Sequence, residues 1–149
     1  MSDRTSTAKA DVAALLTDLG ARAAGLWRVD SERLVQVAFV PAPSLPEAVS
    51  RAFAEATRSV SLDQSSLGIV KAAVLGEVAV SRASELPADA GSGTWLRQFG
   101  AVRSVAVPLR DDLGSIRGVL AVALPDSPLD DNAVADRLRA AARVESWFS

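Results

Sequence analysis

Residues 99–125 constrain the fold more than any other stretch, because they read as two apolar strands joined by a short polar turn. Residues 103–109 are small and β-branched, residues 111–114 (DDLG) have turn chemistry, and residues 116–124 form a second apolar run. Two such runs around a short turn predict a β-hairpin. We expect this hairpin to form the centre of the fold.

The two faces of the predicted hairpin differ in side-chain size, since side chains alternate across a strand. Bulky residues share one face: Val105, Val107, Leu109, Ile116, Leu120, Val122 and Leu124. Mostly small residues share the other: Ser104, Ala106, Pro108, Val119, Ala121 and Ala123. Neither face is polar enough to meet water, so both should be covered. The small-residue face leaves either a seat for a closely packed helix or a cavity.

Composition excludes several classes of function. A chain of 149 residues suits one domain. Its basic and acidic residues are interspersed and its net charge is −2, so no basic patch indicates nucleic-acid binding. No apolar run has the length of a membrane span, and residues 1–12 lack a signal-peptide core, so we expect a cytoplasmic protein without a membrane partner. The chain contains no Cys, His or Tyr, which removes thiolate and imidazole metal sites and the commonest general base.

The carboxylate pairs do not suggest catalysis either. Asp111–Asp112 falls at the predicted turn and Asp130–Asp131 at a helix start, where acidic residues are common. From these observations we expect no enzymatic activity, no metal site and no cofactor.

Helices are expected at both ends of the chain. Residues 6–24 predict an amphipathic helix that either covers the sheet or also pairs with another subunit, and residues 130–147 predict a final helix. The apolar residues of these two helices exceed what one sheet face needs: Val12, Leu15, Leu16, Leu19, Val134, Leu138, Trp147 and Phe148. A bare apolar stripe rarely stays in water, so we predict a homodimer through the terminal helices.

The middle of the chain alternates short strands and helices. Residues 26–29 and 34–40 predict a hairpin, and Ser44 is expected to cap a helix that runs to about residue 57. Short strands at 59–62 and 77–81 flank a short helix at 67–75. A further helix follows, with Ser92 as its expected cap and Phe99 near its end.

Residues 67–70 (LGIV), 76–80 (GEVAV), 99–109 (FGAVRSVAVPL) and 118–122 (GVLAV), in this order, resemble a GAF domain, a ligand-sensing relative of PAS domains. The resemblance covers residues 26–124 of a single domain at 1–149. It implies an α+β fold with an antiparallel sheet in the order second strand, first strand, last strand, penultimate strand and short middle strand. The terminal helices would cover one face, and the inserted helices would cover a pocket on the other.

Within the GAF family, bilin and haem binding use Cys or His, and the methionine sulfoxide reductases of this fold use cysteines, none of which is present here. The Asn-Lys-Phe-Asp-Glu signature of cyclic-nucleotide binding is also absent. The resemblance therefore implies a sensory module that binds an unidentified small molecule and signals through its terminal helices or a separate partner protein. The alternative is a degenerate GAF domain that acts only in dimerisation or protein interaction.

Six residues are candidate ligand contacts: Ser92, Thr94, Trp95, Phe99, Arg103 and Ser104. The turn at 91–94 offers backbone N–H groups and two hydroxyls at a helix start, which suits an anion unless Ser92 only caps the helix. Trp95 and Phe99 would wall the pocket or pack in the core. Arg103, beside Ser104, would bind a carboxylate or phosphate, or else be a solvated charge. Together these residues predict a small anionic ligand.

Overall fold

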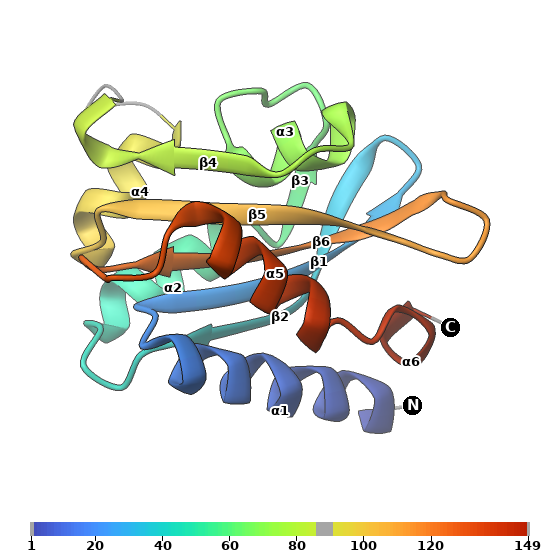
Figure 1. Ribbon diagram of the computed structural model, residues 1–149, viewed down its shortest axis with the longest axis horizontal. Helices are drawn as coiled ribbons and strands as arrows, with labels where there is room; N and C mark the ends of the chain where they lie inside the picture. The colour runs from blue at the N-terminus through green and yellow to red at the C-terminus, as the bar shows by residue number, and fades with distance from the viewer. Residues whose placement is uncertain (1, 86–90, 149) are drawn as a thin grey trace.

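A six-stranded antiparallel sheet forms the centre of the computed structural model, with the strands in the order β3-β2-β1-β6-β5-β4 (Figure 1). The structure describes residues 2–85 and 91–148, and the side chains of residues 7–85 and 93–148. The strands are β1 (Ala23–Asp30), β2 (Arg33–Pro41), β3 (Ser59–Ser61), β4 (Ala79–Arg82), β5 (Arg103–Arg110) and β6 (Ile116–Leu124). The expected order of five strands is confirmed, and β3 extends the sheet beyond β2.

Helices cover both faces of the sheet, as expected. They are α1 (Ser2–Leu19), α2 (Glu47–Ala56), α3 (Gly68–Leu75), α4 (Gly91–Phe99), α5 (Asp131–Ala141) and α6 (Val144–Phe148), with a short 3-10 helix, η1 (Ala83–Glu85). Figure 1 shows α1, α5 and α6 on the near side of the sheet and α2, α3 and α4 behind it. We call the near side the terminal-helix face and the far side the pocket face. In the described part of the chain, no helix combines the length and apolar character of a membrane span.

The β5–β6 hairpin is confirmed, with Val107 opposite Leu120 and Ala106 opposite Ala121. Its turn is fixed by Asp111, whose Oδ1 accepts hydrogen bonds from the backbone N–H groups of Leu113 (2.9 Å) and Ser115 (3.0 Å). This local bonding is typical of Asp in turns. It leaves the carboxylate with a structural role, as the sequence predicted.

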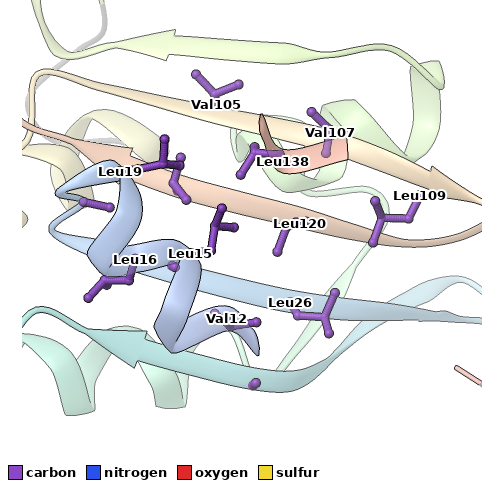
Figure 2. Packing of buried hydrophobic residues seen from close by; sticks show 14 of the residues in the cluster. Val12, Leu15, Leu16, Leu19, Leu26, Val105, Val107, Leu109, Leu120 and Leu138 are labelled. Atoms are coloured by element: carbon purple, nitrogen blue, oxygen red, sulfur yellow. The ribbon is translucent and has the colours of Figure 1, made fainter. Parts of the chain in front are cut away.

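The bulky side chains of β5 and β6 form the largest core together with the terminal helices. Figure 2 shows Val12, Leu15 and Leu19 of α1 over the sheet, close to Leu120 and Leu138. Burying these side chains removes apolar surface from water, which is the main force that holds α1 and α5 on the sheet. The segregation of large and small side chains that the alternation predicted is therefore confirmed.

The apolar surplus inferred for the terminal helices does not exist. The residues on which it rested are 0–7% exposed within this one chain: Val12, Leu15, Leu16, Leu19, Val134, Leu138, Trp147 and Phe148. The sheet face is wide enough to bury all of them once α6 folds back on it. The homodimer expectation loses this support and stays a prediction.

The expected boundaries of both terminal helices were wrong. α1 ends at Leu19, where Gly20 adopts a φ of 63°, and the chain enters β1 at Ala23 instead of continuing in a helix to residue 24. The expected helix at 130–147 is two helices, because Ala142 is extended with a ψ of 137°. This break lets Trp147 turn back and donate a hydrogen bond from Nε1 to Asp11 Oδ2 at 2.9 Å.

The expected cap at Ser44 was also wrong. α2 begins at Glu47, after Pro46, and has no side-chain cap. The Ser44 hydroxyl instead accepts a hydrogen bond from Arg22 Nη1 at 2.6 Å, while Arg22 Nε donates to the Phe99 carbonyl at 2.9 Å. Ser44 thus belongs to a tertiary contact that its local sequence does not reveal.

Candidate ligand pocket

A cavity of about 60 Å³ lies between the pocket face of the sheet and helices α2, α3 and α4. This is several times the space that one water molecule needs. Its lining comprises Ala23, Ala24, Gly25, Trp27, Phe39, Phe53, Thr57, Leu67, Gly68, Ile69, Trp95, Leu96, Phe99, Ser104, Ala106, Ala121, Val122 and Ala123. The cavity that the small-residue face left open as one of two alternatives is therefore present.

Small residues on three adjacent strands form the floor of the pocket. Gly25 of β1 lies opposite Ala121 of β6, and Ala121 lies opposite Ala106 of β5. Two residues away along the same two strands, Ala23 lies opposite Ala123. Side chains this short leave space above the strands that helices carrying large rings do not fill completely.

Aromatic rings form the walls, and Phe53 of α2 contacts four of them. Its ring centroid lies 5.0 Å from those of Phe39 and Phe99, 5.1 Å from that of Trp95 and 6.3 Å from that of Trp27. The contacts with Trp27, Trp95 and Phe99 are edge-to-face, a favoured geometry for aromatic pairs. Trp95 and Phe99 thus pack in an aromatic cluster and also line the cavity, so the two alternatives weighed for them are compatible.

The position of Trp27 is fixed by hydrogen bonding. Its Nε1 donates to the Thr57 carbonyl at 2.8 Å. The Thr57 hydroxyl donates to the Phe53 carbonyl at 2.8 Å and accepts from Gln36 Nε2 at 3.1 Å. Thr57 is 1% exposed, so these bonds satisfy its polar groups inside the protein. These bonds attach the end of α2 to β1 and β2 beside the pocket.

The expectation that Arg103 binds an anion in the pocket was wrong. Arg103 has the same strand parity as Val105 and therefore lies on the terminal-helix face, where it is 5% exposed. Its Nη1 donates to Asp131 Oδ1 at 2.6 Å, and its Nη2 donates to the Leu129 carbonyl. The other oxygen of Asp131 pairs with Arg82. The guanidinium is thus used to attach the start of α5 to the sheet.

The remaining predicted contacts divide into two groups. Ser104 lines the pocket, as do Trp95 and Phe99. Thr94 is half-buried and is not among the lining residues. α4 begins at Gly91, so Ser92 lies inside its first turn instead of at its cap, and its side chain is outside the described ones.

The pocket lining is uncharged throughout the described residues. This does not match the small anionic ligand expected from the sequence, because a buried anion needs a counter-charge or several hydrogen-bond donors. Among the described side chains, no three carboxylates come together where they could hold a metal ion. Asp130 has the predicted structural role, since its Oδ1 accepts a hydrogen bond from the Ala133 N–H at 2.8 Å and caps α5.

Trp27 and Phe39 are pocket residues that were not predicted from the sequence. Phe39 lies on the apolar face of its strand and Phe53 on the apolar stripe of its helix, so their local pattern marks both only as core residues. The signal available in the sequence was Gly25 two residues before Trp27, which places a glycine and a large ring on the same face of one strand.

No protein-family model matches the chain, and no curated protein sequence matches it. Several solved structures are similar to it. A putative GAF sensor protein from Burkholderia vietnamiensis has a TM-score of 0.63 at 19% identity, covering 95% of this chain and 75% of that one. A GAF domain/HD domain protein from Geobacter sulfurreducens has a TM-score of 0.64 at 13% identity, covering 94% and 90%. The chain has the GAF fold.

The GAF fold also occurs in an enzyme. A type II free methionine-R-sulfoxide reductase from Thermoplasma acidophilum has a TM-score of 0.65 to this chain at 13% identity, covering 93% of this chain and 87% of that one. This similarity overturns the expectation that the chain is not an enzyme, because a protein of the same fold carries out catalysis.

Proposed function

We propose that this chain is a sensory module of the GAF type that binds a small molecule between the sheet and helices α2, α3 and α4. The observation that carries the proposal is the cavity over the alanine and glycine floor. Protein interiors are close-packed, and empty space among apolar side chains costs stability. A pocket over the middle strands of the sheet, walled by aromatic rings, is therefore best explained by an occupant. The similarity of the fold to that of a putative GAF sensor protein supports the same function.

Output would pass through the terminal helices to a partner protein. Asp131, the first residue of α5, pairs with Arg82 of β4 and Arg103 of β5. Strand β5 also presents Ser104 and Ala106 to the pocket. Because the same strand contributes to the pocket and holds the start of α5, a shift of β5 on binding would alter the position of that helix.

Helix α4 offers a second connection between the pocket and α5. Arg97 of α4 donates from Nη2 to the Ala83 carbonyl at 2.6 Å, and Ala83 follows Arg82 directly in the chain. A ligand that moves Trp95 or Leu96 would therefore act on the segment that carries Arg82. We propose this route as the coupling between binding and signalling.

Native mass spectrometry of the protein, purified without denaturation, tests the proposed binding together with a thermal-shift screen of metabolites. The variant Ala121→Leu places a larger side chain in the floor of the pocket. Ala48→Leu makes the same change on the exposed surface of α2 and serves as the matched control. We expect a bound mass or a stabilising compound for the wild type and for Ala48→Leu, and neither for Ala121→Leu. A ligand retained by Ala121→Leu at unchanged affinity, or no ligand for the wild type, would contradict the proposal.

A further inference from the structure

Two serines lie directly opposite each other on strands β4 and β5. Ser81 pairs with Ser104 in the antiparallel register, and residues opposite each other project from the same face of a sheet. Since Ser104 lines the pocket, both side chains lie on the pocket face. Ser81 is 6% exposed, so it is among the few buried polar residues of the described chain.

Neither serine hydroxyl takes part in a hydrogen bond of the described residues. This contrasts with Thr57, the other hydroxyl residue of the lining, which both donates and accepts. Among the described side chains, no buried polar atom lacks a hydrogen-bond partner, so the two hydroxyls keep some accessible surface. Both hydroxyls are therefore available to bond a polar atom that enters the pocket.

The charges around the pocket argue for an uncharged ligand. The described lining carries none, and nearby guanidiniums are already engaged. Arg103 is bonded to Asp131 on the opposite face of the sheet, and Arg22 is bonded to the Phe99 carbonyl and Ser44. An ionised ligand would lose its hydration without gaining a counter-charge.

The walls argue for a flat ligand. Trp95 and Phe99 are stacked with an interplanar angle of 29°, and Phe39 and Phe99 are inclined by the same angle. Aromatic faces bind flat rings well, and the alanine and glycine floor lets such a ring lie close to the strands. The described lining has only two side-chain hydroxyls, those of Thr57 and Ser104, which are too few to satisfy the several hydroxyls of a sugar.

We propose that the pocket takes an uncharged, planar heteroaromatic molecule whose ring nitrogen or carbonyl oxygen accepts a hydrogen bond from the Ser81–Ser104 pair. The proposal rests on the binding function proposed above and names its ligand class. The rings supply apolar contact, and the two hydroxyls fix the orientation of the molecule through its polar edge.

Three probes of similar size test the ligand class: quinoline, naphthalene and 1-naphthoate. They are titrated by NMR at a pH where quinoline is uncharged and naphthoate is ionised. Quinoline has one acceptor nitrogen that naphthalene lacks, and naphthoate adds a negative charge. We expect quinoline to bind about fivefold more tightly than naphthalene, as one hydrogen bond in a pocket allows. We expect naphthoate to bind at least about tenfold more weakly than quinoline.

The double variant Ser81→Ala/Ser104→Ala tests the polar anchor, and Ser146→Ala, on the exposed surface of α6, is the control. The double variant should lower quinoline affinity about fivefold and leave naphthalene affinity unchanged, while Ser146→Ala changes neither. Unchanged quinoline affinity in the double variant would overturn the anchor. Tighter binding of naphthoate in the pocket would overturn the ligand class but leave the binding function intact, whereas no binding by any probe would count against both.

Discussion

The indole ring of Trp27 lies over Gly25, so that a Cβ built on Gly25 would be 2.4 Å from the ring atom Cη2. Real Cβ atoms do not approach other atoms this closely, and the indole is held in place by its bond to the Thr57 carbonyl. Glycine at this position therefore lets the tryptophan lie flat along the strand and form the pocket wall.

The substitution Gly25→Ala should destabilise the fold, because the indole must move and its hydrogen bond weakens. We expect a loss of about 1–3 kcal/mol in the free energy of unfolding, the usual range for over-packing a core. Urea denaturation measures the loss. In a Trp27→Phe background, where the smaller ring leaves room, Gly25→Ala should cost clearly less. Equal costs in the two backgrounds would show that the contact is not the cause.

Removing the Asp131 carboxylate should leave the Arg103 guanidinium without its ionic partner. The Arg103 side chain is 6% exposed and that of Asp131 is 28% exposed. Breaking a fully buried pair costs about 3–5 kcal/mol, and the partial exposure of Asp131 lowers our expectation for Asp131→Ala to about 2–3 kcal/mol. Asp136→Ala, which removes an exposed carboxylate from the same helix, should cost less than about 0.5 kcal/mol in the same denaturation experiment. Similar losses for the two variants would contradict the structural role of Asp131.

Removing the Asp130 cap should lower the free energy of unfolding less than removing the Asp131 carboxylate does. Asp130→Ala removes the acceptor for the Ala133 N–H and should cost about 1 kcal/mol, while Asp130→Asn keeps an acceptor and most of the stability. Asp126→Ala, in the preceding loop, should change the free energy of unfolding by less than about 0.5 kcal/mol. A cost for Asp130→Asn as large as that for Asp130→Ala would indicate that charge, and not capping, is what matters.

Much of the sheet could be predicted from the sequence, because its signals are local. The alternation along 103–109 and 116–124 fixed which residues face which layer, and Ala106 and Val107 lie on the sides that it indicated. The turn role of Asp111 and the cap role of Asp130 also depend on atoms a few residues away. Such short-range bonding is encoded in the residues themselves.

The errors concern contacts between distant parts of the chain. Arg103 is held by Asp131, 28 residues later, and Ser44 by Arg22, 22 residues earlier. The sequence around Arg103 is compatible with a ligand contact, and the sequence around Ser44 is compatible with a helix cap. The strand parity of Arg103 with Val105 could have placed it on the terminal-helix face, so that error was avoidable. The aromatic walls required the helix of Phe53 to be placed over the strand of Trp27, which no local pattern specifies.

The proposed function depends on ligand binding in the space between the alanine floor and α2, α3 and α4. The most direct measurement is an NMR titration of quinoline into protein with labelled alanine methyl groups. Ala23, Ala106, Ala121 and Ala123 line the pocket, whereas Ala8 and Ala135 lie in the core of the terminal-helix face. We expect the four pocket methyl signals to shift with one common saturation curve while those of Ala8 and Ala135 do not move. Shifts confined to Ala8 and Ala135, or no shift of the pocket methyl groups at saturating quinoline, would contradict it.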